Sequence, residues 1–368
     1  MDLVLNSDQT MMRDAARKFV AMNLTFEARR KQVAEGGADR WSDLAEMGWL
    51  MLPVPEDAGG IGGSLEDLAL IAEELGRGIA LEPFVTGAVL PARLLALGGG
   101  ALRQSLLAKL ASGEQRFSAA LFEAKHRYSL QKLDTAAKAD SGGYILNGSK
   151  ILVPGGADQL IVAARLGDDA RPALLLVDVK SAGVTQREYR TIDGVSAADF
   201  VFENVRLPSD AVLAKPEDAV AALDRALDET IVLICADAVG CMDRAIELTA
   251  EYLRIRKQFG QTLASFQALQ HGVANLFMEA NDARSMVYRA IAACNDDTAD
   301  RAKAVSACKI KVLNAARLVT GQSIHFHGGI GMTCEYQVGD HLRRILVAEQ
   351  AFGNAQYHFE RYLGESGV

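Results

Sequence analysis

Arg256 and Phe259 lie in the segment YLRIRKQFGQ, residues 252–261, where the arginine could hold a phosphate group and the phenylalanine could pack on a ring. A guanidinium binds phosphate oxygens through charge-assisted hydrogen bonds, and an aromatic ring can pack on a heterocycle. The same segment also suits an ordinary helix end, because Arg254 complements the helix dipole and Gly260 stops the helix. Taken alone, the segment favours an ordinary helix end over a ligand-binding role. Other parts of the chain are needed to choose between the two interpretations.

A second segment, FHGGIGMTCEY at residues 326–336, contains paired glycines, and His325 just before it forms an H-x-H pair with His327. Paired glycines let a backbone approach a ligand closely or open a tight turn between helices. His325 and His327 tempt a metal interpretation, but two residues on a helix are about 200° apart and do not share a face. Because no convincing third ligand lies nearby, we expect no metal site.

A third glycine-rich segment, WSDLAEMGWLMLPVPEDAGGIGG at residues 41–63, predicts a helix followed by a loop. It is not a dinucleotide fingerprint, because no strand is expected before it and its glycine spacing differs.

The composition argues against several classes of function. The formal net charge is −8 and the isoelectric point is about 5.4, whereas nucleic-acid-binding domains usually carry a basic stripe. The cysteines are odd in number, scattered and without a C-x-x-C pair, which predicts neither a disulfide framework nor a zinc site. They are Cys235, Cys241, Cys294, Cys308 and Cys334.

The N-terminal segment becomes charged and amphipathic almost at once and lacks the apolar core of a signal peptide. No apolar run reaches the roughly 18 residues that a transmembrane helix needs. We therefore expect a cytoplasmic protein that does not span a membrane.

The hydrophobic pattern predicts helices at both ends of the chain and strands in the middle. Residues 7–35 carry a helical stripe, and more helices are expected up to about residue 111. From 117 to 214 the segments are short and bounded by turns, which favours an antiparallel barrel or sandwich. Asn147-Gly148 between two apolar runs predicts a hairpin turn.

Helical periodicity returns after Pro216. One apolar stripe predicts a long helix that stops at Gly260, followed by helices over about 266–293 and 302–323. A final helix is expected from about Tyr336. The predicted architecture is therefore helical, then β, then helical.

Together these segments resemble the acyl-CoA dehydrogenase family over nearly the whole chain. Six fragments occur in the family's order, which is far more specific than any one of them. They are GWLMLPVPEDAGGIG (48–62), EELGRGIALEPFV (73–85), GGYILNGSKILV (142–153), DFVFENVRLP (199–208), RKQFGQTLASFQALQH (256–271) and HGGIGMTCEY (327–336). Within the family, the chain most resembles the small subunit of pimeloyl-CoA dehydrogenases and, next, the two-subunit steroid side-chain dehydrogenases.

The resemblance implies a mainly α fold with a central β domain. The family's arrangement would give an N-terminal helical domain over residues 1–115, a middle antiparallel β-barrel over 116–214 and a C-terminal four-helix bundle over 215–368.

FAD is the cofactor that the resemblance implies. By motif match, Arg256 would contact the pyrophosphate and Phe259 would pack near the adenosine end, both on a neighbouring subunit's flavin. The other implied FAD contacts are His325, Gly328, Gly329, Asn354 and Gln356.

The implied reaction removes the α-proton of an acyl-CoA and transfers a β-hydride to flavin N5, which yields the 2-enoyl-CoA. It needs a carboxylate within reach and hydrogen bonds to the thioester oxygen. Electron-transfer flavoprotein is the implied electron acceptor. The chain would work in a homo-oligomer or in a heterotetramer with a second acyl-CoA dehydrogenase subunit.

This chain departs from the family in three places. Many members have a flavin-contacting loop that reads roughly T-E-P-x-x-G-S-D, whereas residues 121–135 read LFEAKHRYSLQKLDT. Leu152 and Pro154 replace an aromatic residue and a threonine that normally lean on the flavin. Phe352, followed by Gly353, stands where many members have the catalytic glutamate, and phenylalanine cannot accept a proton.

Some members place the base on the long helix instead, at the position of Thr230 in this chain. Glu229 is one residue away and is therefore this chain's candidate base, although one residue on a helix is about 100° of rotation. An acidic residue near a helix N-terminus also suits the dipole without any catalytic role.

Three alternatives remain at this stage. In a dehydrogenase subunit, Glu229 could be the base, or a partner chain could supply both the base and part of the flavin site. The chain could also be a non-catalytic scaffold or an FAD-positioning subunit of a heteromer. A nucleic-acid-associated branch of the same fold would need a basic surface, which the net charge of −8 opposes.

Overall fold

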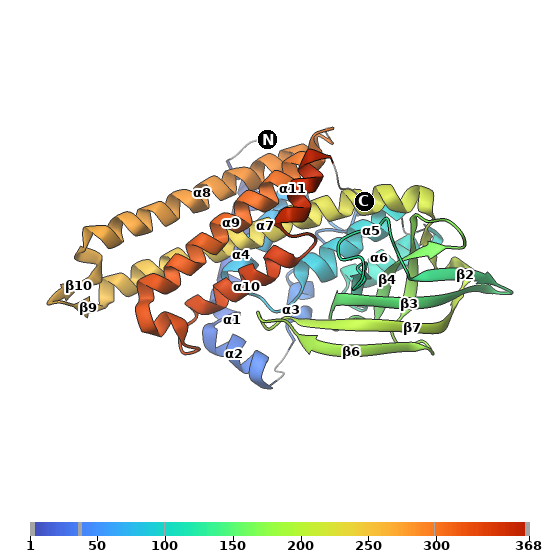
Figure 1. The fold of residues 1–368 in the computed structure, drawn as a ribbon, viewed down its shortest axis with the longest axis horizontal. Helices are drawn as coiled ribbons and strands as arrows, with labels where there is room; N and C mark the ends of the chain where they lie inside the picture. The colour runs from blue at the N-terminus through green and yellow to red at the C-terminus, as the bar shows by residue number, and fades with distance from the viewer. Residues whose placement is uncertain (1–3, 36–38, 99, 298, 365–368) are drawn as a thin grey trace. The chain divides into compact units, whose positions relative to one another are not determined.

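The computed structural model describes residues 4–35, 39–98, 100–297 and 299–364. The chain forms two compact units, each assembled from separate segments (Figure 1). The first unit takes its described residues from Met1–Gly37, Leu65–Ala80 and Ile231–Ser366. The second takes its described residues from Ala38–Ser64 and Leu81–Thr230.

The first unit is built from helices. α8 and α9 pack side by side, α10 and α11 pack on α9, and α1 packs on α4 (Figure 1). The helix bounds are α1 Ser7–Asn23, α2 Phe26–Glu35, α4 Leu65–Arg77, α8 Gln267–Asn295, α9 Arg301–His327, α10 Val338–Gln350 and α11 Ala355–Leu363. α7, Pro216–Ile255, contributes residues to both units.

The second unit combines a sheet with helices. Its longer helices are α3 Trp41–Glu46, α5 Leu90–Gly98 and α6 Arg103–Ala111, and a π-helical turn covers Phe84–Val89. The strands are β1 Phe117–Ala120, β2 Ala136–Asp140, β3 Gly143–Pro154, β4 Gln159–Leu166, β5 Pro172–Asp178, β6 Val184–Arg190, β7 Ser196–Pro208 and β8 Val212–Ala214.

The strand order is β6-β7-β3-β2-β4-β5-β8, and β1 also pairs with β4. Most pairs are antiparallel, but β1 and β2 both run parallel to β4. The predicted antiparallel arrangement therefore holds for most strand pairs, and the two parallel pairs with β4 are the exceptions. Parallel neighbours require a long connection in the chain, which residues 121–158 provide between β1 and β4 and which β3 provides between β2 and β4.

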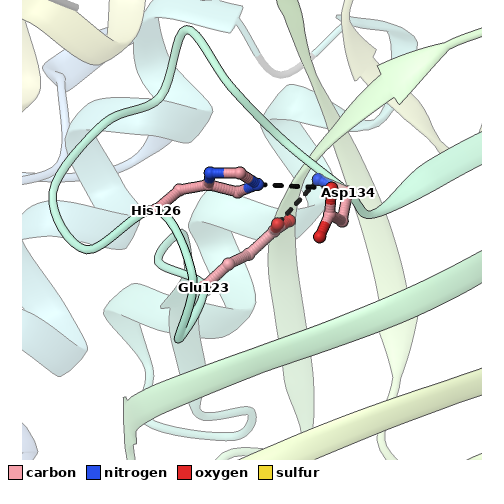
Figure 2. Close-up of side chains that lie close together, drawn as sticks. All are labelled: Glu123, His126 and Asp134. Carbon is pink, nitrogen blue, oxygen red and sulfur yellow. Dashed lines mark hydrogen bonds and ion pairs between the residues drawn. The ribbon is translucent and has the colours of Figure 1, made fainter.

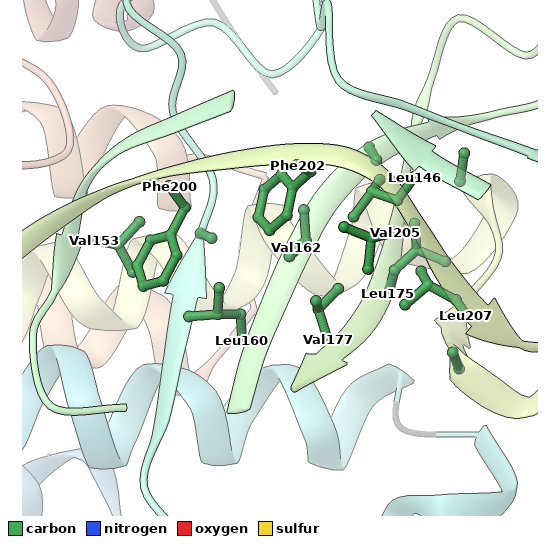
Figure 3. Close-up of a cluster of buried hydrophobic side chains, with 14 of the residues drawn as sticks. Leu146, Val153, Leu160, Val162, Leu175, Val177, Phe200, Phe202, Val205 and Leu207 are labelled. Atoms are coloured by element: carbon green, nitrogen blue, oxygen red, sulfur yellow. The ribbon is translucent and has the colours of Figure 1, made fainter. Parts of the chain in front are cut away.

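Alternating side chains of the sheet form the core of the second unit, as Figure 3 shows. Phe200 and Phe202 project from β7 on the same face, with ring centroids 6.4 Å apart and planes 8° from parallel. Both rings are almost fully buried among the aliphatic side chains of β3, β4 and β5. Burying a side chain of this size contributes about 1.5–3 kcal/mol, so this face holds the strands together.

The predicted hairpin at Asn147-Gly148 is wrong. β3 runs unbroken from Gly143 to Pro154, and its register against β7 shifts between Leu146 and Gly148, as in a β-bulge. Gly148 has φ +144°, and a Cβ there would lie 2.5 Å from the Cα of Thr135. The glycine therefore permits a bulge and a close backbone approach, which its sequence context cannot distinguish from a turn.

Helix boundaries also differ from the prediction over residues 7–35. The first helix ends at Asn23, where Leu24 leaves helical geometry with φ −107° and ψ 45°. The hydroxyl of Thr25 then accepts a hydrogen bond from the backbone N–H of Ala28 at 3.2 Å and caps the next helix. A side-chain cap of this kind begins a new helix without interrupting the apolar stripe, so periodicity alone does not detect it.

The C-terminal half shows two more differences. α7 ends at Ile255 rather than Gly260, and a hairpin of β9 Lys257–Gln258 and β10 Gln261–Thr262 follows. The predicted final helix is two helices, α10 and α11, separated at Phe352 and Gly353, which have φ values of +55° and +112°. Positive φ at consecutive residues cannot continue a right-handed helix.

The predicted fold class, with helices at both ends and strands in the middle, is confirmed. The three-domain division at residues 115 and 214 stays a prediction. Among the described residues, no single helix is long and apolar enough to cross a membrane. The helices Phe84–Gly98 and Gly100–Ala111 meet the length and composition criteria only as a pair, with a bend of 117° between them.

Candidate functional site

Arg256 and Phe259 lie at the hairpin that follows α7 in the first unit. Phe259 and Gly260 form its turn with φ values of +53° and +81°, a combination that tight hairpin turns of type I′ require. The Phe259 ring is 89% exposed and touches Phe266 edge-on at 6.3 Å between centroids. The turn therefore presents an exposed ring that is available to a ligand or a neighbouring chain.

The Arg256 guanidinium is exposed and, within the described part of the chain, makes no hydrogen bond or ion pair. Its backbone is fixed, because its N–H donates to the Tyr252 carbonyl at 2.9 Å and its carbonyl accepts from the N–H of Leu263 at 2.8 Å. A fixed backbone with a free guanidinium, next to a free ring, suits a ligand with phosphate and an aromatic base. The donor set therefore fits a dinucleotide such as FAD.

His325, Gly328 and Gly329 lie at the end of α9 and in the 3-10 turn Gly328–Met332 that follows it. His325 is exposed, with its ring 6.0 Å from that of Phe326. A Cβ added at either glycine would meet nothing within 4 Å. The backbone here is open, and nothing in the fold itself requires glycine for space at these two positions, which fits close approach by a ligand.

His327 points away from His325, as the spacing predicts. It is buried between Tyr252 and Tyr336, at 4.6 and 4.8 Å between ring centroids. Its Nδ1 lies 2.7 Å from the Ser323 carbonyl, and burial lowers its pKa. Tyr252, His327 and Tyr336 all lie within the quoted motifs, but their residue types alone do not predict this aromatic cluster.

Asn354 and Gln356 lie at the beginning of α11. The Oδ1 of Asn354 accepts a hydrogen bond from the Tyr357 N–H at 3.0 Å, which caps the helix. Its Nδ2 amino group has no partner among the described residues and could donate to a ligand. Gln356 is exposed and donates from Nε2 to Glu360 at 2.7 Å.

Phe352 occupies the turn between α10 and α11. Its carbonyl oxygen lies 3.1 Å from Nε2 of His358, and its backbone has a positive φ of +55°. The turn is thus well held, but the side chain at 352 has no ionisable group.

Glu229 is on the part of α7 that belongs to the second unit, and it is only 7% exposed. Arg225 donates from Nε to Oε1 at 3.0 Å, and Nε of Arg93 on α5 forms an ion pair with Oε2 at 2.8 Å. Neighbouring Thr230 is fully buried, and its hydroxyl donates to the Ala226 carbonyl at 2.7 Å. Both Glu229 oxygens already face a cation, so a proton could be accepted only by disrupting an ion pair.

The altered loop at residues 121–135 is held by a buried ion pair that the sequence analysis missed. Lys150 is fully buried and donates from Nζ to Glu123 at 2.9 Å and to the Leu121 carbonyl at 3.0 Å. The Glu123 carboxylate also accepts the backbone N–H groups of Asp134 at 2.7 Å and Thr135 at 3.0 Å. The pair thus fastens both ends of the loop.

This environment shifts both pKa values. Burial lowers the pKa of Lys150 to about 8, and the charge of Glu123 opposes that shift. Burial alone would raise the pKa of Glu123, but the charge of Lys150 and the hydrogen bonds to the carboxylate hold it below its usual value. The pair is therefore charged at neutral pH.

Glu123, His126 and Asp134 cluster together, as Figure 2 shows, with one potential ligand atom from each within 4.8 Å of the others. His126 Nε2 lies 3.2 Å from Asp134 Oδ1. The carboxylate of Glu123 is, however, already bound to Lys150 and two backbone N–H groups. A cation would have to sit next to the Lys150 ammonium, so the cluster is better explained as an ion-pair network.

Leu152 and Pro154 follow Lys150 on β3. Leu152 is 59% exposed with φ +55°, and its N–H donates to Asp199 at 3.2 Å. The Pro154 carbonyl accepts from the Ser118 hydroxyl at 2.9 Å. This strand end offers an aliphatic side chain but no aromatic ring or hydroxyl for a flavin.

A pocket of about 990 Å³ opens in the first unit, and none of the predicted site residues lines it. Most of its lining side chains are charged, and the arginines with the clearest geometry are already paired. Arg17 lies 2.5 Å from Glu74, and Arg29 lies 2.7 Å from Asp340. Its size does not make it the reaction site.

Three family models match this chain. The N-terminal, middle and C-terminal domains of acyl-CoA dehydrogenases match residues 6–114, 118–205 and 220–363. The fold and these three matches define a class of flavoprotein oxidoreductases that act on acyl-CoA. The chain belongs to the acyl-CoA dehydrogenase family, whose members are FAD-dependent oxidoreductases acting on acyl-CoA.

Among curated relatives, the probable acyl-CoA dehydrogenase YngJ of Bacillus subtilis (strain 168) is 29% identical, with 97% of each chain covered. Acryloyl-CoA reductase (NADH) of Anaerotignum propionicum is 25% identical over 97% of this chain and 94% of the relative.

Solved structures agree with the fold. A variant of the Tcur3481-Tcur3483 steroid ACAD is 28% identical, with a TM-score of 0.86 and 97% of each chain covered. Butyryl-CoA dehydrogenase from Megasphaera elsdenii has a TM-score of 0.91 at 23% identity, with 99% of each chain covered, and shows the shared fold alone.

Proposed function

We propose that this chain is a subunit of an FAD-dependent acyl-CoA dehydrogenase that converts an acyl-CoA thioester into the 2-enoyl-CoA. The observation that carries the proposal is the unpaired guanidinium of Arg256 beside the 89% exposed ring of Phe259, in a chain of this family. When bound, FAD would accept the hydride that leaves the β-carbon of the substrate.

The residues of this chain would bind and orient the cofactor of a neighbouring subunit. Arg256 would bind the pyrophosphate and Phe259 would pack near the adenosine end. The open backbone at Gly328 and Gly329 would let the dinucleotide approach closely. His325, Asn354 and Gln356 would supply further polar contacts, Asn354 through its free Nδ2 group.

A partner chain is the better source of the catalytic base. Phe352 has no ionisable group, and both Glu229 oxygens face guanidinium groups of Arg93 and Arg225. The altered loop at 121–135 and the aliphatic Leu152 also leave one side of a flavin site incomplete. We therefore favour a heteromer in which the partner provides the base and the flavin cradle, while Glu229 remains this chain's own candidate.

The comparisons support a second subunit without identifying it. The name of the 28% identical steroid ACAD joins two components, Tcur3481 and Tcur3483. A chain 25% identical to this one belongs to a structure named for the electron-transferring flavoprotein of Acidaminococcus fermentans. Electron-transfer flavoprotein is the proposed electron acceptor, and the complex would work in the cytoplasm.

The proposal is tested by expressing the chain alone and together with a dehydrogenase-like chain encoded beside it, with the partner alone as a control. Flavin per chain is measured by absorbance, and activity by acyl-CoA-dependent reduction of an electron-acceptor dye. Alone, the chain should be colourless or weakly yellow and inactive, and the complex should carry full flavin. A fully yellow and active homo-oligomer would overturn the need for a partner.

A non-catalytic scaffold is the second candidate, favoured by the aliphatic and phenylalanine side chains at positions 152 and 352. The flavin content of the complex after Arg256→Ala distinguishes a cofactor-binding subunit from a scaffold. Loss of FAD from the complex after Arg256→Ala would rule out a scaffold that makes no cofactor contact, whereas full flavin content would support it.

A further inference from the structure

Lys309 on α9 is a buried cation without a carboxylate partner. Its side chain is 2% exposed, and it forms no ion pair within the part of the chain that the structure describes. Nζ donates instead to two backbone carbonyls, those of Ala348 at 2.6 Å and Ala351 at 2.9 Å. Burying an ammonium without a counter-charge costs free energy. The two hydrogen bonds to carbonyl groups must therefore offset much of this desolvation cost.

The two carbonyls belong to the C-terminal end of α10, Val338–Gln350, and to the residue after it. Carbonyl groups in the last turn of a helix have no intrahelical partner, and the helix dipole makes this end negative. The ammonium of Lys309 therefore satisfies orphan carbonyls and lies where a cation is most favourable. It fixes the beginning of the turn between α10 and α11.

The far side of the same turn is held by α11. His358 is fully buried, and its Nε2 lies 3.1 Å from the Phe352 carbonyl, which makes Nε2–H the donor. Nδ1 then faces the Ser306 hydroxyl of α9 at 3.4 Å. Gly353 lies between these contacts, and a Cβ there would lie 2.3 Å from the Tyr357 ring. The turn is therefore packed too tightly for a side chain at this position.

The turn leads directly into Asn354 and Gln356, the proposed FAD contacts at the beginning of α11. We propose that Lys309 is a positioning residue for this cofactor-binding end: its ammonium holds the turn 348–354, and the turn places Asn354 and Gln356. The inference rests on the proposed function, because it needs FAD to be bound by α11.

The positioning depends on the charge of Lys309. Burial lowers the pKa of Lys309 to about 8, so the ammonium loses its proton within an experimentally accessible range. A neutral amine has one N–H fewer and no positive charge, which weakens both carbonyl contacts. The titratable groups around it are Cys235 on α7, Cys308 on α9, Glu349 on α10 and His358 on α11.

The test compares wild type, Lys309→Met and the control Lys311→Met in the assembled complex. Lys311 is two residues away on the same helix, but it is 41% exposed and paired with Glu279. FAD affinity is measured by titrating the deflavinated complex at pH 7 and pH 9. Hydrogen-exchange protection factors are measured for peptides covering residues 348–356.

In wild type, FAD affinity and protection of the turn should both fall several-fold between pH 7 and pH 9. Lys309→Met should weaken FAD about tenfold at pH 7, reduce protection and abolish the pH dependence. Lys311→Met should behave as wild type. If Lys309→Met does not fold, the wild-type pH series still decides, because unchanged protection and affinity at pH 9 would overturn the inference.

Failure of this inference can be distinguished from failure of the proposed function. If Arg256→Ala weakens FAD but Lys309→Met does not, the positioning role is wrong and the proposed function stands. If neither variant changes FAD affinity, both are overturned. Unchanged protection of the turn in Lys309→Met overturns the positioning role whatever the affinity.

Discussion

Glu123 and Lys150 form a buried ion pair, Nζ to Oε1 at 2.9 Å, that joins the loop after β1 to the middle of β3. The side chains are 4% and 0% exposed, so water screens them very little. Lys150 and Glu123 also form hydrogen bonds with backbone groups of the loop. The ion pair therefore anchors both ends of residues 121–135.

Lys150→Met should destabilise the protein by about 3–5 kcal/mol, because it leaves the Glu123 carboxylate buried without its cation. Glu123→Gln should also destabilise, since an amide cannot accept three N–H groups as a carboxylate does. The double variant should cost less than the sum of the two. Urea unfolding of all three variants measures this, and strictly additive costs would show that the two groups do not interact.

Arg256→Ala should weaken FAD binding about 10- to 100-fold, because a charge-assisted hydrogen bond contributes about 1.5–3 kcal/mol. The side chain is exposed, so the thermal unfolding temperature of the flavin-free complex should not change. Arg254→Ala is the matched control, since Arg254 is exposed on the last turn of α7, two residues before Arg256. Equal flavin content in both variants would refute the assignment of Arg256.

Glu229→Gln should reduce stability more than catalysis. The substitution removes the negative charge that Arg93 and Arg225 share, and we expect flavin reduction by substrate to change less than about tenfold. Loss of a general base would instead reduce that rate about 10²–10⁴-fold with FAD still bound. Stopped-flow flavin reduction in the assembled complex distinguishes the two, and a loss of the larger size would identify Glu229 as the base.

His341 on α10 should make the protein sensitive to acid. Burial and the nearby charges of Arg244, Arg29 and Arg77 lower its pKa to about 3. An unfolded histidine has a pKa near 6.5, so between about pH 6.5 and pH 3 the unfolded state binds one more proton. The free energy of unfolding therefore falls as the pH falls through this window, by up to about 1.4 kcal/mol per unit.

His341→Met should remove this part of the acid sensitivity. It should cost little at pH 7, because neither ring nitrogen of His341 has a hydrogen-bond partner in the described chain. Exposed His271→Met is the control. Unfolding measured from pH 7 to pH 5 should show a shallower decline for His341→Met alone, and identical slopes in all three proteins would contradict the assignment.

Long apolar stripes predicted the helices well, because α8 and α9 each bury a stripe along many turns and α7 is buried continuously over residues 226–242. What the stripe could not reveal was where a helix stops and restarts. The side-chain cap by Thr25 and the positive φ values at Phe352 and Gly353 both leave the apolar pattern intact. Asn147-Gly148 was misassigned because a bulge and a turn use glycine for the same conformational freedom.

In the candidate site, too, local features could be predicted from the sequence, whereas contacts between distant residues could not. Arg256 and Phe259 could be proposed from the motif match, since the hairpin that presents them is local in the sequence. The contacts of Lys309 were invisible, because its partners are carbonyls some 39 and 42 residues away and a backbone group leaves no trace in the residue types. Lys150 and Glu123 are 27 residues apart, and neither looks unusual in a sequence where charged residues are common.

The loop at 121–135 is closed at its base, where Lys150 holds Leu121 and Glu123 holds Asp134 and Thr135. The segment between these anchors can therefore vary in composition while the sheet below keeps its register. Such a segment behaves as an exchangeable insert. In this family, a subunit could then lose or change its flavin-contacting loop over evolution without having to rebuild its β domain.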